Sequence, residues 1–245
     1  TKYCRVKYAV GVSNGTDAIK LALLALGIKH NDGVICPVFT YYATAGAIVS
    51  IGAIPVFSDI NPETYNISIS SVEKVIRKRR DIKIRAIVPV HLYGQCADMD
   101  GILKIARRYN LKVIEDAAQA FGAEYLTRSR ADEGKGKKAG TMGDCGAVSF
   151  FPAKNLGAFG DAGMVLTNSR LIADRIKILR NQGNKEKYYH IELGFNNRMD
   201  TIQAAVLKVK LKYLDSWNRK RQKVAKYFNE QLRYLDIKTP FVADY

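Results

Sequence analysis

Short apolar runs alternate with amphipathic segments along most of the chain. Runs typical of buried strands occur at residues 33–39, 53–60, 84–94, 111–116, 146–151 and 162–168. Between them, apolar residues recur at helical spacing over residues 15–28, 41–52, 70–80, 98–110 and 169–183. The β-branched runs suit strands that are buried on both faces of a parallel sheet. The pattern therefore predicts an α/β fold with a mainly parallel sheet flanked by helices.

After about residue 200 the pattern becomes continuously helical. Ile202 and Val209 share one helical face, and Trp217, Val224 and Phe228 extend an apolar stripe along the chain. We expect a pair of helices or one long kinked helix in this part.

Composition indicates an ordinary soluble globular protein. Of the 245 residues, 47% are hydrophobic and 25% are charged. No apolar run reaches the roughly 20 residues needed to cross a bilayer, and the first residues show no secretory signal. We therefore expect a cytoplasmic protein with no membrane partner. The four cysteines are scattered, which predicts free buried thiols rather than a disulfide framework or a metal site.

A net charge of +16 raises the question of nucleic acid. The run RKRR, residues 77–80, ends a predicted helix, where basic residues favour the negative end of the helix dipole. The run KGKK, residues 135–138, belongs to a Gly-rich charged loop that we expect to be solvated and mobile. Neither run is interleaved with aromatic residues for base stacking. We expect no nucleic-acid partner, and we interpret the charge as tuning solubility and the attraction of anionic ligands.

One lysine stands between two predicted strands. In AVSFFPAKNLGAFGDAGMVLT, residues 147–167, Lys154 follows one apolar run and precedes another, and Asp161 is the only other charged residue. A turn lysine that faces water is one interpretation. The other is a lysine whose amine forms a Schiff base with an aldehyde or ketone.

Other residues offer partners for such a lysine. Asp116 ends an apolar run, where a parallel strand delivers a side chain to the ligand crevice. It either caps the next helix or hydrogen-bonds a protonated ring nitrogen, the contact that pyridoxal phosphate chemistry requires. The small residues SNGTDA, residues 13–18, precede a helix whose free N–H groups favour an anion, and Ser149 could add a hydroxyl.

Seven stretches in series resemble one family, the DegT/DnrJ/StrS family of nucleotide-sugar aminotransferases that depend on pyridoxal 5′-phosphate (PLP). They occur in the family's order and span roughly residues 10–230. The resemblance implies the fold-type I architecture of the aspartate aminotransferase superfamily, with PLP as the cofactor. The stretches are GVSNGTDAIKLAL, PVFTYYATAGAI, GAIPVFSDINPETYNI, VPVHLYGQCADMD, VIEDAAQAFGA, SFFPAKNLGAFGDAG and GFNNRMDTIQAAVL.

The resemblance implies a role for each matching residue around the cofactor ring. Lys154 would form the Schiff base with PLP and shuttle the proton between substrate and cofactor. Asp116 would bind the ring nitrogen, and Gln119 would approach the ring hydroxyl. Tyr41 falls where the family stacks an aromatic residue on the ring, although plain packing is the alternative and Tyr42 beside it leaves the choice open.

The resemblance also implies how the phosphate is held. Thr16 and Asp17 would offer backbone amides, and Ser149 would add its hydroxyl. Asn196 and Arg198, in GFNNRMD, match a segment that reaches the phosphate of the neighbouring subunit. We therefore expect a homodimer with shared active sites.

Lysine at position 154 favours transamination, because some relatives carry histidine there and catalyse a dehydration instead. The implied reaction is ping-pong. An amino donor, usually L-glutamate, passes its amine to PLP, and the amine then goes to a keto sugar linked to a nucleotide diphosphate, for polysaccharide or glycoconjugate biosynthesis. The alternative is a non-catalytic regulatory or binding protein with the same fold. Intact Lys154 and Asp116 favour the enzyme.

Three features depart from the family. The chain is shorter than its relatives, so we expect a PLP-binding large domain over residues 1–214 and a linking helix with the start of a truncated small domain over residues 215–245. The segment 126–144 is longer than the equivalent loop and indicates a surface insertion. Ala162 stands where the family usually has glycine.

Overall fold

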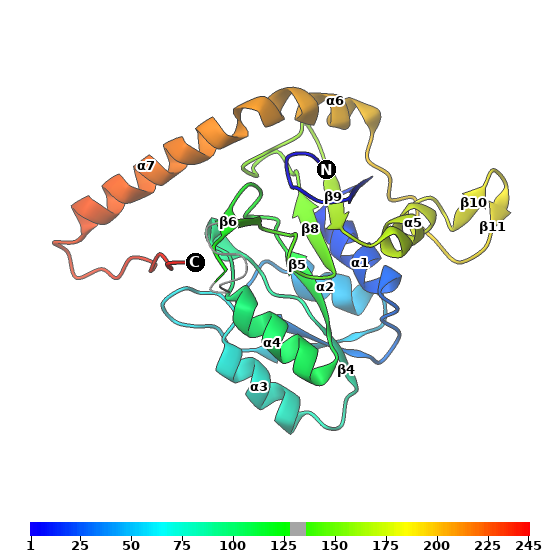
Figure 1. Ribbon diagram of the computed structural model, residues 1–245, viewed down its shortest axis with the longest axis horizontal. Coiled ribbons are helices and arrows are strands. Elements are labelled where there is room, and N and C mark those ends of the chain that lie inside the picture. Colours follow the sequence, from blue (N-terminus) through cyan, green and yellow to red (C-terminus); the bar gives the residue numbers. More distant parts are fainter. Residues whose placement is uncertain (128–135) are drawn as a thin grey trace.

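A seven-stranded sheet forms the centre of the computed structural model, which describes residues 1–127 and 136–245 (Figure 1). Its strands are β1 (Tyr8–Val12), β2 (Gly33–Pro37), β3 (Ile54–Ser58), β4 (Ile84–Ile87), β5 (Lys112–Asp116), β8 (Cys145–Ser149) and β9 (Gly163–Thr167). They lie in the order β1-β9-β8-β5-β4-β2-β3. Strand β9 runs in the direction opposite to the other six strands of this sheet, so the predicted mainly parallel sheet is confirmed.

Helices cover both faces of the sheet and bury two apolar cores. Helices α1 (Gly15–Ala25), α2 (Ala43–Ser50) and α5 (Arg170–Leu179) pack on one face. Helices α3 (Ile69–Lys78) and α4 (Met99–Tyr109) pack on the other. Strand β5 alternates between the cores, with Val113 in the α3–α4 core and Ile114 in the α1–α2–α5 core. All four cysteines are buried and free, as predicted.

The helices begin where the sequence places capping residues. The side chains of Asn14, Ser68, Asp98 and Ser169 each accept a backbone N–H from the first turn of α1, α3, α4 and α5, respectively. Helix α4 ends at Asn110, which has the left-handed φ of 50° that is common after a helix. These caps fix where each helix starts relative to the end of the strand before it.

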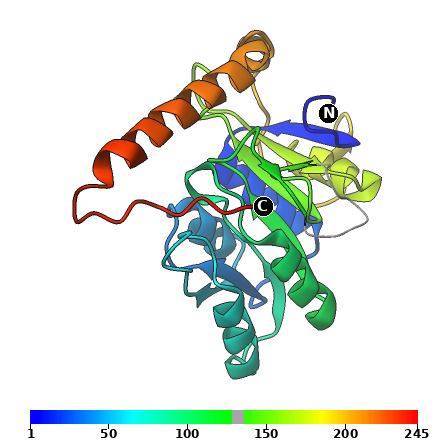
Figure 2. The same cartoon turned by 60° about the vertical axis from the view of Figure 1, so that its left-hand side comes forward.

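The C-terminal part is a kinked helical arm. Helix α6 (Thr201–Lys210) passes through a 3₁₀ turn, Leu211–Tyr213, into α7 (Leu214–Leu232), which agrees with the expected pair of helices or long kinked helix. Helix α7 extends away from the sheet, and the chain after it turns back toward the body (Figures 1 and 2). Most of the predicted apolar stripe is exposed along this arm. No helix in the described part of the chain is both long and apolar enough to span a membrane.

Several short strands were not predicted. They are β1 at the sheet edge, the pair β6 (Glu124–Tyr125) and β7 (Lys137–Lys138), and the hairpin β10 (Asn184–Glu186) and β11 (Tyr189–His190). The prediction that KGKK is solvated and mobile is wrong for Lys138. That side chain is 12% exposed, and its ammonium lies 3.1 Å from the Glu124 carboxylate and donates to the Gly122 carbonyl. Residues 128–135 of the expected insertion lie outside the described residues.

Candidate active site

The carboxyl ends of β5 and β8 and the start of α1 meet at a pocket of about 640 Å³. Six of the nine predicted site residues line it: Thr16, Asp17, Tyr41, Gln119, Ser149 and Lys154. The remaining lining residues are Asn14, Gly15, Ala43, Phe151, Ala153 and Asp161. Ligands of open α/β sheets collect at this edge, so the fold and the predicted residues indicate the same place.

Lys154 lies in the connection between β8 and β9. Its backbone N–H donates to the Phe151 carbonyl at 2.8 Å, and the next residue, Asn155, donates its side-chain amide to the Phe121 carbonyl at 2.5 Å. These contacts anchor the turn on both sides of the lysine. The Lys154 side chain is half-buried and lines the pocket, which answers the question of whether it simply faces water.

Asp116 is the last residue of β5 and lies buried beside the pocket. Its carboxylate accepts the Thr44 hydroxyl at 2.8 Å and the Ala118 N–H at 3.2 Å. Burial raises the pKa of Asp116, while these two donors and the positive charge of Lys154 oppose the increase. The chain that follows forms a turn rather than a helix, so the helix-capping interpretation of Asp116 is wrong.

The start of α1 packs directly against the end of β8. A Cβ atom at Gly15 would lie 2.7 Å from the Ser149 Cβ, so a side chain at position 15 would push the helix away. The backbone amide of Asp17, which we expected to bind a phosphate, instead donates to the capping Asn14 side chain at 2.8 Å. The amides of Gly15 and Thr16 belong to the first turn, where helix geometry supplies no acceptor. These two amides offer donors to an anion.

The Asp17 side chain belongs to a local network at the same helix start. Its carboxylate accepts Ser13 at 2.5 Å and Asn14 at 2.9 Å, and the Lys20 ammonium lies 2.8 Å away. Burial would raise the pKa of Asp17, but the hydrogen bonds from Lys20, Ser13 and Asn14 outweigh burial and lower it. Lys20 therefore offsets a negative charge close to the amides.

Two further residues complete the rim. Tyr41 is 72% exposed and lines the pocket, whereas the Tyr42 ring lies against Gly46, so the geometry favours Tyr41 as the aromatic residue of the site. Gln119 accepts the Tyr93 N–H on its side-chain oxygen at 2.8 Å.

Asn196 and Arg198 are not among the residues that line this pocket. Asn196 pairs with Asn181 in an isolated β-bridge, and the Arg198 guanidinium donates to the Asn181 side chain at 2.5 Å. Within one chain, this segment is held beside the end of α5.

Comparison with known proteins decides the family. The model of the DegT/DnrJ/EryC1/StrS aminotransferase family matches residues 1–244. The chain belongs to this family. Its aminotransferases depend on PLP.

Family relatives match the chain closely over part of their own length. The chain is 48% identical to the pleiotropic regulatory protein of Geobacillus stearothermophilus, covering 94% of this chain and 58% of the relative. It is 43% identical to the UDP-2-acetamido-2-deoxy-3-oxo-D-glucuronate aminotransferase of Pseudomonas aeruginosa, with coverages of 96% and 62%. The crystal structure of Streptomyces venezuelae DesV has a TM-score of 0.90 at 43% identity, covering 99% of this chain and 62% of DesV. The fold-type I architecture is therefore confirmed, and the chain spans about 60% of these relatives.

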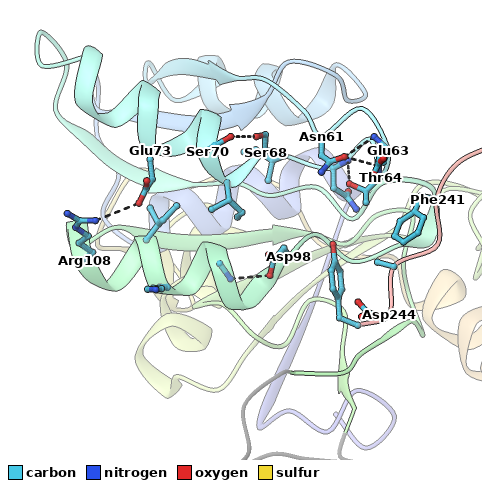
Figure 3. Close-up of a pocket in the computed structure, with 18 residues that line it drawn as sticks. Asn61, Glu63, Thr64, Ser68, Ser70, Glu73, Asp98, Arg108, Phe241 and Asp244 are labelled. Atoms are coloured by element: carbon cyan, nitrogen blue, oxygen red, sulfur yellow. Dashed lines mark hydrogen bonds and ion pairs between the residues drawn. The ribbon is translucent and has the colours of Figure 1, made fainter.

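A larger hollow lies elsewhere, between α3, α4 and the C-terminal segment (Figure 3). Its volume is about 720 Å³, and none of the nine predicted residues lines it. Glu73 and Arg108 form an ion pair across its edge at 3.7 Å, and the Phe241 N–H donates to the Glu63 carbonyl. The hollow is on the α3–α4 side of the sheet and shares no lining residue with the pocket at Lys154.

Sequence reasoning missed three buried polar residues near Asp116. Thr44 holds the Asp116 carboxylate, and the His91–Glu115 pair lies buried beside it. Thr44 carried one signal, because it is a polar residue in the mostly apolar segment 41–52. His91 and Glu115 lie 24 residues apart, and their pairing depends on the strand order.

Proposed function

We propose that this chain is the cofactor-binding part of a PLP-dependent aminotransferase that converts a nucleotide-linked keto sugar to an amino sugar. The observation that carries the proposal is that Lys154 lines the pocket and acts electrostatically on the buried carboxylate of Asp116, which lies at the end of β5. A lysine amine and a nearby acid are the minimum that PLP chemistry requires.

The donor set of the pocket fits PLP. Asp116 is a buried acid whose burial disfavours its charge, so a protonated ring nitrogen would be a favourable partner. Gly15 and Thr16 present amides for the phosphate, with the Ser149 hydroxyl next to them. When bound, PLP supplies an electron sink that stabilises negative charge on the substrate carbon.

The chain's own residues would then orient the groups and move the proton. The Lys154 amine would bind PLP and carry the proton to and from the substrate carbon. The exposed ring of Tyr41 would cover one face of the PLP ring and limit access of water. Asp116 would keep the ring nitrogen protonated, with Thr44 fixing the direction of the carboxylate.

The proposal also includes the amino acceptor, the amino donor and the oligomeric state. Names of relatives such as the P. aeruginosa enzyme support a nucleotide-linked keto sugar as amino acceptor. L-Glutamate is proposed as amino donor, and a homodimer is proposed in which Asn196 and Arg198 serve the neighbouring pocket. We also propose that residues 1–214 form the large domain and that residues 215–245 lead into a small one.

The second candidate is a non-catalytic regulatory protein, which the name of the G. stearothermophilus relative favours. Such a protein has no need of a reactive amine beside a buried acid. Glutamate-dependent amination of a UDP-linked 3-keto sugar would distinguish the two functions.

The first experiment maps the site of PLP attachment. The purified chain is incubated with PLP, reduced with borohydride, digested and analysed by mass spectrometry. We expect a phosphopyridoxyl tag on Lys154 and none on exposed Lys226, which serves as the internal control. Labelling scattered over surface lysines would contradict an organised PLP site.

A further inference from the structure

A short loop beside the pocket is closed at its base by a buried histidine. The His91 ring accepts the Ala97 N–H on Nδ1 at 3.1 Å, so its proton is on Nε2. Nε2 then donates to the Glu115 carboxylate at 2.8 Å. One imidazole thus joins the two ends of the loop, residues 91 and 97, to strand β5.

Glu115 is a rigid anchor for this histidine. It precedes Asp116 in β5, so its side chain points to the opposite face of the sheet. Its Oε1 accepts the N–H groups of Met142 and Gly143, each at 2.6 Å, and its Oε2 also accepts the Gly140 N–H at 2.8 Å. Three backbone donors and one imidazole therefore fix the carboxylate, and a buried network satisfied in this way holds its geometry.

The loop holds one residue in a costly conformation. Tyr93 lies in the 3₁₀ turn Leu92–Gly94 and has φ 56° and ψ 19°, the left-handed region that costs a non-glycine residue about 1 kcal/mol. The Asn66 side chain supports the turn by accepting the Leu92 N–H and donating to the Cys96 carbonyl. Strained backbone persists where its surroundings over-determine it, and it is common at functional sites.

The strained residue donates its N–H to a side chain that lines the pocket. Tyr93 donates to the side-chain oxygen of Gln119 at 2.8 Å, and Gln119 lines the pocket. With its oxygen held by Tyr93, the Gln119 amide is left to present its NH₂ group as a donor. The path from Glu115 through His91 and Tyr93 therefore sets which end of Gln119 is offered to a ligand.

We propose that His91 is a positioning residue for PLP binding, acting through Tyr93 on Gln119. The inference rests on the proposed function, because a bound PLP would supply the acceptor for the Gln119 donor. His91 itself lies on the other face of the sheet, bound to Glu115, and acts only through the loop.

A double-mutant cycle tests the path. PLP dissociation constants are measured for wild type, His91→Asn, Gln119→Met and the double variant. Asparagine keeps an acceptor for the Ala97 N–H and loses the donor to Glu115. We expect His91→Asn to weaken PLP binding roughly five- to tenfold, the effect of one misplaced hydrogen bond. In the Gln119→Met background, where the Gln119 donor is already absent, the same substitution should weaken PLP binding less than about twofold.

Two controls separate positioning from general loss of structure. Gln95→Ala removes the clamp of this loop on the C-terminal segment, where the Gln95 side chain donates to the Phe241 carbonyl and accepts the Ala243 N–H. It leaves the His91 contacts in place, so PLP affinity should change less than about twofold. Equal loss from His91→Asn in both backgrounds, or a lower Tm with unchanged PLP affinity, would overturn the proposal.

Hydrogen exchange provides a readout that needs neither PLP nor a His91 variant. In the cofactor-free protein, Gln119→Met removes the acceptor of the Tyr93 N–H and should speed exchange of that amide about tenfold. An unchanged exchange rate would contradict the path even if the His91 variants fail to fold. If wild type fails to bind PLP while the exchange rate responds as expected, the loop geometry holds and the proposed function fails.

Discussion

At the scale of single residues, two successive carboxylates have opposite surroundings. Glu115 accepts four hydrogen bonds from three backbone amides and His91. Asp116 accepts two, from Thr44 and Ala118, and burial raises its pKa. Glu115 is therefore stabilised by the protein alone, whereas Asp116 would gain from a cationic partner. This difference separates a structural acid from a ligand-binding one within a single dipeptide.

The raised pKa of Asp116 makes a prediction about the protein without cofactor. The folded protein binds the Asp116 proton more tightly than the unfolded chain does. The folded state therefore loses stability as pH rises from the ordinary pKa of 3.8 toward the raised value. Asp116→Asn removes this titration, and the Thr44 hydroxyl can then accept from the new amide. The Tm of the variant minus that of wild type should be smallest below pH 4 and become positive toward pH 7. Thermal melts over this range would check it, and a difference that does not vary with pH would contradict it.

At the scale of elements, the site depends on how closely α1 approaches β8. Gly15→Ala adds a methyl group 2.7 Å from the Ser149 Cβ and 3.3 Å from its Cα, and backbone at that position yields little. We expect a loss of about 1–3 kcal/mol in the free energy of unfolding, although alanine favours helix by about 1 kcal/mol. PLP affinity should fall as well, because the first-turn amides move with the helix.

Gly101→Ala is the matched control for this prediction. Gly101 also lies in a first helical turn, but an added Cβ would meet the flexible end of the Ile69 side chain at 2.9 Å. Its cost should stay within about 1 kcal/mol, with PLP affinity unchanged. Urea unfolding and PLP titration of both variants provide the comparison. Equal losses at Gly15 and Gly101 would exclude the close approach of α1 and β8 as the cause.

Hydrophobic pattern predicted the strands and helices that bury long apolar faces. It failed for the β6–β7 pair, because the two lysines of β7 carry no apolar signal. The half-buried Lys138 is held there by its ion pair with Glu124 and its hydrogen bond to the Gly122 carbonyl. It also missed β1, whose place at the sheet edge depends on pairing with β9 far along the chain. Lys154 could be predicted from the sequence because it is a single lysine between two strands. The His91–Glu115 pair could not, because the two residues become neighbours only in the folded structure.

At the scale of the whole molecule, the exposed apolar surface of the helical arm bears on assembly. Ile202 and Val209 on α6 and Val224 and Phe228 on α7 are each more than half exposed. Large exposed apolar patches are typical of surfaces that another chain or domain covers. The arm begins directly after the segment that contains Asn196 and Arg198, so contacts made by the arm would also place that segment.

A subunit-mixing experiment tests the shared site of the proposed homodimer. Lys154→Ala chains lack the reactive amine, and Arg198→Ala chains lack the cation proposed for the neighbouring phosphate. Each alone should bind PLP poorly. In a dimer of one of each, the Arg198→Ala chain keeps its lysine and receives Arg198 from its partner, so one of the two pockets is complete. Random mixing should therefore restore wild-type affinity and a Lys154 tag at about a quarter of all pockets. No recovery after mixing, with dimers present by light scattering, would mean that Arg198 does not serve the neighbouring pocket.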